Sequence, residues 1–93
     1  MGNQAVKIYP NPSEDVMTLS FDKNNSTVTF NRAGQEGYRI TVYDVIGRQV
    51  FDSGKQYSDS YNLYKKDFGK GLFIARISVG DKASPIVKRI VFE

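Results

Sequence analysis

The chain has 93 residues, of which 40% are hydrophobic and 25% charged, and a formal net charge of +3. This composition is typical of a globular domain, and the length allows one domain with one core. The absence of cysteine and histidine excludes disulfides, thiolate zinc sites and nucleophiles activated by histidine. Because no carboxylates are spaced as an acid/base pair, we expect neither an enzyme nor a bound cofactor. The 13 lysines and arginines are spread along the sequence, so we expect no nucleic-acid partner.

Residues 1–4 lack the basic and apolar segments of a signal peptide, and we expect them to be a flexible end or a cloning remnant. A single domain is expected over residues 5–93. No apolar run approaches membrane-spanning length, so we expect no membrane insertion. If the protein is exported, its address lies in a longer precursor or in the domain itself.

Three strands are predicted before the middle of the chain. Residues 5–9 form a short strand that two closely spaced prolines end, because each proline removes a backbone donor. Residues 16–21 alternate apolar and polar side chains, the period of a strand with one face on a core. The polar segment 22–26 is interpreted as a hairpin turn; a calcium loop is the alternative, but the glycine and closing glutamate of such loops are missing. A further strand is predicted over 27–30 and a loop over 31–37.

The central segment, residues 38–50, predicts two strands and the turn that joins them. Asp44 fits the first position of a type I turn, where its carboxylate accepts a backbone N–H. Gly47 supplies the left-handed conformation that closes the turn. The strand resumes at Val50, and we expect residues 52–55 to break it. The turn fixes the register, since a slip of one residue would place the apolar side chains in water.

The last third of the chain predicts three strands and no helix, since no segment has helical periodicity. Residues 61–64 form a short strand and residues 72–79 a longer one with a fully apolar face. The glycines between them permit unusual backbone angles, but no helix N-terminus follows to complete a phosphate site. The closing strand, residues 86–92, has apolar and basic residues on both faces. Lys88 and Arg89 are interpreted as charges that protect an edge strand from pairing with other chains, or as residues that a partner reads.

Seven or eight short strands with frequent turn signals predict an all-β fold, an immunoglobulin-like antiparallel β-sandwich. A small barrel is the alternative. The spacing of three phenylalanines favours the core, namely Phe21, Phe30 and Phe73. Three tyrosines are the better candidates for exposed rings, namely Tyr9, Tyr43 and Tyr57.

Taken together, four motifs resemble the type A C-terminal sorting domain of the type IX secretion system of Bacteroidota. The first is the opening motif Tyr9, Pro10, Asn11 and Pro12. The second is the central turn with Asp44, Gly47 and Arg48. The third is the strand that begins with Gly71 and Phe73, and the fourth is the basic closing strand. The family usually has tyrosine at the position of Phe73, so a hydroxyl that sandwich folds often use at a corner is missing here.

The resemblance implies a secretion signal rather than an enzyme. Such domains direct a cargo fused to their N-terminal side through the periplasm and across the outer-membrane translocon to the cell surface or the medium. A sortase-like peptidase then commonly removes the domain. The resemblance also implies a cleavage point upstream of Tyr9 or within the first residues.

Our hypothesis for recognition is that the secretion machinery reads the closing strand, by strand addition. The residues proposed for this contact are Gly80, Asp81, Lys88, Arg89, Ile90 and Val91. The central turn is a second candidate surface. A carbohydrate-binding or adhesive module with an exposed row of aromatic rings is the alternative function, and a passive spacer is a third.

Overall fold

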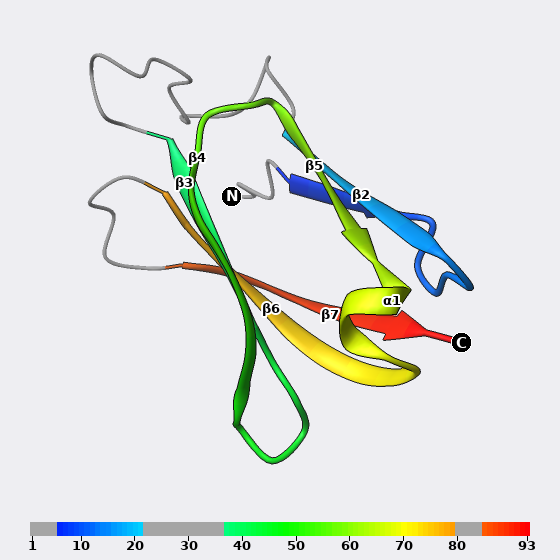
Figure 1. The fold of residues 1–93 in the computed structure, drawn as a ribbon. Coiled ribbons are helices and arrows are strands. Elements are labelled where there is room, and N and C mark those ends of the chain that lie inside the picture. The colour runs from blue at the N-terminus through cyan, green and yellow to red at the C-terminus, as the bar shows by residue number, and fades with distance from the viewer. Residues whose placement is uncertain (1–5, 22–36, 80–84) are drawn as a thin grey trace.

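The computed structural model describes residues 6–21, 37–79 and 85–93, which form two antiparallel sheets packed face to face (Figure 1). The three-stranded sheet has the order β1-β2-β5, with β1 at Val6–Tyr9, β2 at Val16–Phe21 and β5 at Ser60–Tyr64. The four-stranded sheet has the order β4-β3-β6-β7, with β4 at Gln49–Gln56, β3 at Tyr38–Tyr43, β6 at Gly71–Val79 and β7 at Ile86–Phe92. The predicted all-β sandwich is confirmed, and two separate sheets replace the alternative barrel.

The core lies between the two sheets and is built from alternate residues of the strands, as the period of two predicts. Phe21 and Phe73 are buried, as expected. The predicted strand 27–30 with Phe30, and the segment 22–26 considered as a calcium loop, lie outside the described residues. The most deeply buried side chains of the described residues include Met17, Leu19, Tyr38, Ile40, Leu63, Ile77, Ile90 and Phe92.

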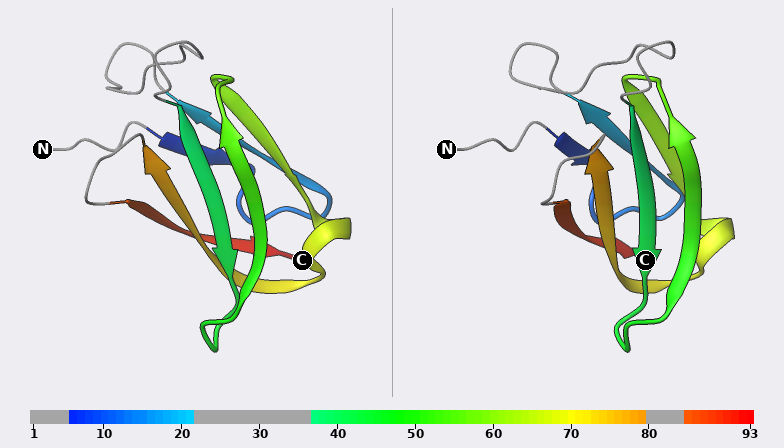
Figure 2. Two further views of the ribbon diagram at one scale, coloured as in Figure 1. Left: turned by 60° about the vertical axis from the view of Figure 1, so that its left-hand side comes forward. Right: turned by 90° about the vertical axis from the view of Figure 1, so that its left-hand side faces the viewer.

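One end of the sandwich is closed by α1, a single helical turn at Lys65–Phe68 (Figure 2). The expectation of no helix is wrong here, because a segment of four residues is too short to show a helical period. Gly69 ends the turn with a φ of 91° and donates its N–H to the Lys65 carbonyl at 2.7 Å. The ring of Phe68 lies 5.1 to 5.7 Å, centroid to centroid, from the rings of Phe51, Phe73 and Phe92. The helical turn thus places one aromatic ring across strands β4, β6 and β7.

The strand β4 continues through residues 52–55, where the sequence predicted a break. The register shifts between Arg39 and Thr41, so β4 bulges there instead of ending. Gly54 has a φ of 71°, and the Ser53 hydroxyl accepts a hydrogen bond from the Ile40 N–H at 3.0 Å. Gly54 allows the left-handed conformation of the bulge, and the Ser53 hydroxyl replaces a hydrogen bond of the β-ladder. Together they keep the strand paired.

Candidate interaction surfaces on the four-stranded sheet

The turn between β3 and β4 is organised by the carboxylate of Asp44. Its Oδ1 accepts hydrogen bonds from the backbone N–H groups of Ile46 and Arg48, at 3.1 and 2.9 Å, and its Oδ2 accepts one from Arg48 Nε at 3.1 Å. These bonds, above all that from the Arg48 N–H, hold the pKa of the Asp44 carboxyl below its usual value. Gly47 has a φ of 88° and donates its N–H to the Asp44 carbonyl at 3.0 Å. The predicted turn geometry is confirmed.

The tip of this turn projects beyond the rest of the molecule (Figure 1) and carries two apolar side chains. Val45 is 68% exposed and Ile46 is 78% exposed. Their exposure is unusual for large apolar residues that lie side by side, and it is not required for the register, which Asp44 and Gly47 fix. The tip is therefore available for contact with another surface.

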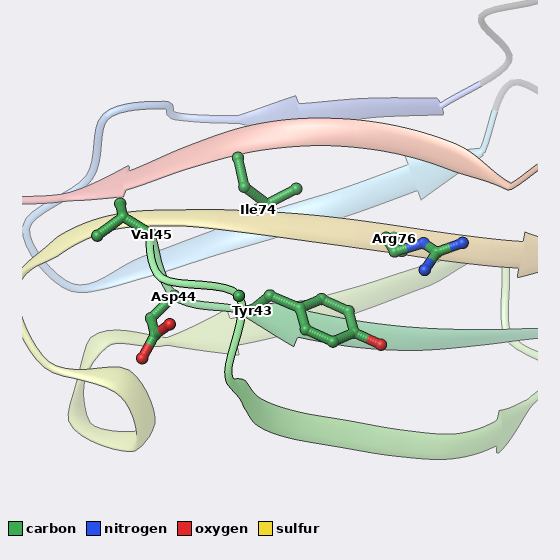
Figure 3. Close-up of a pocket in the computed structure, with 6 residues that line it drawn as sticks. Tyr43, Asp44, Val45, Ile74 and Arg76 are labelled. Atoms are coloured by element: carbon green, nitrogen blue, oxygen red, sulfur yellow. The ribbon is translucent and has the colours of Figure 1, made fainter.

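A shallow open pocket of about 520 Å³ lies between this turn and β6. Its lining consists of Tyr43, Asp44, Val45, Gly47, Ile74 and Arg76. In Figure 3 the Tyr43 ring and the Arg76 guanidinium extend in the same direction from neighbouring strands. The pocket combines an apolar floor with one cation at its side, and the sequence analysis did not identify it.

The strand β7 is an edge strand with apolar and basic residues on both faces, and its register with β6 shows which face is buried. Ile90 and Phe92 are buried against the other sheet, whereas Val87 is 57% exposed. Lys88 and Arg89 are neighbours in the strand, so their side chains lie on opposite faces of the sheet. The structure therefore does not bring together the two basic residues that the sequence analysis grouped.

The opening motif closes part of the outer edge of β7. The Asn11 side chain donates from Nδ2 to the Arg89 carbonyl at 2.8 Å and accepts at Oδ1 from the Val91 N–H at 3.1 Å. The Ser13 N–H donates to the Val91 carbonyl at 3.0 Å, and the Glu93 N–H donates to the Ser13 carbonyl at 2.8 Å. Segment 10–13 thus occupies the place of a neighbouring strand along residues 89–93, a role that the sequence analysis did not assign to Asn11.

The loop that carries Asn11 is fixed by a buried serine. Ser13 is 6% exposed, and its hydroxyl donates to the Val16 carbonyl at 2.8 Å and accepts from the Asp15 N–H at 3.1 Å. The Lys65 N–H donates to the Asp15 carbonyl at 2.7 Å, so the same loop is also tied to α1. These bonds fix the part of the loop that follows Asn11 and so help to orient the Asn11 amide toward β7.

Among the remaining motif residues, Gly71 and Phe73 have structural roles in β6. Gly71 begins β6 with a φ of 139°, a value that side chains rarely permit, and Phe73 is buried against Phe68. The exposed motif residue Tyr9 lies in the three-stranded sheet. Gly80 and Asp81 lie outside the described residues.

The exposed aromatic row that a carbohydrate-binding module needs is not formed by the three expected tyrosines. Tyr9 is exposed as expected, whereas Tyr43 and Tyr57 are half-buried. Tyr9 and Tyr43 also belong to different sheets. Tyr64, which the sequence analysis did not select, is 39% exposed.

The arginines described on the outer face of the four-stranded sheet fall into two groups. Arg39 is paired with Asp52, and Arg48 is paired with Asp44. Arg76 and Arg89 are exposed, and neither has a carboxylate partner among the described residues. Two guanidinium groups on this face therefore remain available to a ligand.

Within the described ranges, no three acidic residues gather as a metal site, and no helix is long and apolar enough to cross a membrane. A family model described as a secretion system C-terminal sorting domain matches residues 7–93. A search of curated proteins found no match. The matched range contains every described strand from β2 to β7 and all of β1 except its first residue.

Proposed function

The chain belongs to the family of secretion system C-terminal sorting domains, and from this premise we propose how the domain serves export. Domains of this family are sorting signals for type IX secretion and are not catalytic. We propose that the domain crosses the periplasm behind an N-terminal cargo and is recognised by the outer-membrane translocon as a folded sandwich. A sortase-like peptidase then removes it, and the cargo reaches the cell surface or the medium. The observation that carries this proposal is the family match across residues 7–93.

Recognition by strand addition requires an edge with unsatisfied backbone groups. Along β7 the odd-numbered residues direct their N–H and C=O groups outward, as the bonds of Arg89 and Val91 to segment 10–13 demonstrate. Val87 therefore also directs its backbone groups outward, and no described residue bonds to them. We propose that the machinery pairs with β7 around Val87.

The proposal gives different roles to the four described residues among the six first considered for recognition. Ile90 is fully buried, and Val91 is bonded to Asn11 and Ser13, so both position the strand for its partner. Lys88 and Arg89 follow Val87 directly and supply positive charge on the two faces of the strand. An extended segment with acidic side chains is the partner that this arrangement favours.

A reporter fusion tests the proposed function. A signal peptide and a fluorescent protein are placed before residues 3–93 and expressed in a host that has the type IX system. We expect fluorescence outside the outer membrane, and retention in the periplasm of a translocon mutant. Retention in the periplasm of both strains would overturn the proposal, provided that the fusion is intact on an immunoblot.

A further inference from the structure

We propose a second contact of the sorting signal, which rests on the proposed function: the outer face around Ile74 binds an extended peptide with an apolar and an acidic side chain two residues apart. We define the Ile74 surface as Tyr43, Ile74, Arg76 and Arg89 together with the wall formed by Val45. This surface lies on the face of the sheet and is distinct from the backbone edge of β7. It therefore recognises side chains, whereas the edge recognises the backbone.

The register places the members of this surface next to one another. Tyr43 of β3 pairs with Ile74 of β6, and Ile74 pairs with Arg89 of β7. Arg76 follows Ile74 by two residues and projects from the same face of β6 (Figure 3). Residues two apart in a strand are separated by roughly 6.6 Å, so an extended ligand that lies along β6 matches the spacing of an apolar site and a cationic site.

The apolar part of the surface is concave and partly unfilled. The pocket of about 520 Å³ has Ile74 and Val45 in its lining, a volume within the range of small ligand sites. Tyr43 is half-buried and anchored by a bond from its hydroxyl to Gln49 Oε1 at 3.3 Å. The half-buried ring offers an apolar wall, and a tyrosine loses little conformational entropy on binding because it has only two χ angles.

The charge on the surface favours a carboxylate ligand. Two acidic residues described on this face are already engaged, Asp44 by Arg48 and Asp52 by Arg39. Arg76 and Arg89 keep their guanidinium groups for a ligand, and guanidinium binds carboxylate in a bidentate geometry. An acidic peptide is thus attracted, while a basic peptide meets two like charges.

A peptide fits these observations better than an anionic membrane. Membrane surfaces are bound by apolar side chains surrounded by free cations. The apolar tip has Val45 and Ile46, but its neighbouring cation, Arg48, is paired with Asp44. The free cations lie beside the pocket on β6 and β7 instead of around the tip.

The test is selection of a displayed random heptapeptide library on the purified 93-residue chain, followed by titration of the enriched peptide. We expect enriched sequences with a carboxylate two residues from a large apolar side chain. Arg76→Glu, and independently Arg89→Glu, should weaken binding of the synthetic peptide about tenfold, the effect of one lost charge-assisted bond. Lys55→Glu is the matched control, since it reverses an exposed charge on β4 away from the pocket, and it should change the dissociation constant less than twofold.

Several results would overturn this inference. They are the enrichment of neutral or basic peptides, no enrichment at all, or binding that both arginine variants leave unchanged while their melting temperatures match the wild type. Arginine-dependent binding to phosphatidylglycerol vesicles without peptide enrichment would assign the surface to a membrane, and arginine-dependent dimerisation would assign it to a second copy. Export of the wild-type reporter fusion tests the proposed function separately. If the fusion is exported but the chain binds no peptide, the proposal for the Ile74 surface alone is rejected.

Discussion

The two halves of β7 differ in what lies along their outer edge. From Arg89 to Glu93 the edge is occupied by Asn11 and Ser13, whereas around Val87 the backbone groups have no bonded partner in the described structure. On the inner face the two halves also differ in burial, since Ile90 and Phe92 are fully buried and Ile86 is half-buried. One strand thus combines a part that stabilises the fold with a part that is free to bind.

Under the proposed recognition of β7, this difference would let one short strand serve both stability and export. Backbone edges of sheets promote unwanted pairing unless they are covered, and here the opening motif covers the end of β7 that packs against the core. The uncovered segment is limited to a few residues around Val87, and Lys88 and Arg89 follow it directly. A partner must supply a complementary strand and tolerate positive charge to bind there.

The largest effect expected is on stability, from truncation in the covered half. Ile90→Ala should lower the free energy of unfolding by about 3 kcal/mol, since it removes a fully buried side chain. Ile86→Ala, on the same face in the open half, should lower it by only about 1 kcal/mol, since Ile86 is half-buried. Urea unfolding measures both values, and equal losses for the two variants would contradict the division of β7.

A smaller effect is expected when the cover itself is weakened. Asn11→Ala removes both side-chain bonds to β7 and should lower the free energy of unfolding by about 1 kcal/mol. The Val91 amide should then exchange with solvent faster, as hydrogen exchange followed by NMR would detect. Asn11→Asp keeps an acceptor for the Val91 N–H but loses the donor to Arg89, and it should protect Val91 more than alanine does. Unchanged exchange at Val91 in the alanine variant would show that Asn11 does not cover the edge.

The opposite edge strand, β4, provides a comparison that depends on pH. The hydrogen bonds from Arg39 and from the Gly54 N–H lower the pKa of Asp52 from 3.8 to about 2. A carboxyl whose folded-state pKa is depressed stabilises the fold above its unfolded pKa and loses that contribution as the pH falls toward the folded value. The stability that Asp52 contributes should therefore be lost between about pH 4 and pH 2. Urea midpoints should fall less over this range in Asp52→Asn than in the wild type, and parallel curves would contradict the assignment.

The sequence predicted the strands where alternation was regular and failed where pairing partners decide the structure. Residues 16–21 and 72–79 alternate clearly, and both form strands with the expected buried face. In β7 both faces hold apolar and basic residues, so only its register with β6 shows which face is buried. The predicted break at residues 52–55 is wrong because Ser53 and Gly54 form a bulge inside a paired strand.

The sequence predicted those parts of the candidate surfaces that depend on local residues, and missed those that depend on contacts between distant segments. The Asp44 turn is local, and its hydrogen bonds follow from residue types four positions apart. The contact from Asn11 to Arg89 joins residues 78 positions apart, and no local pattern indicates it. The pocket beside Ile74 likewise arises from β3, its turn and β6, which meet only in the folded sheet.

The most direct test of recognition at the open half of β7 is the export of reporter fusions that carry Val87→Pro. Proline removes the outward N–H at this position while edge strands tolerate it, so the melting temperature should fall by only a few degrees. Val87→Thr keeps the N–H and the β-branched shape and is the matched control. We expect the proline variant to be retained in the periplasm and the threonine variant to be exported like the wild type. Export of a folded proline variant at the wild-type level would contradict recognition of this edge.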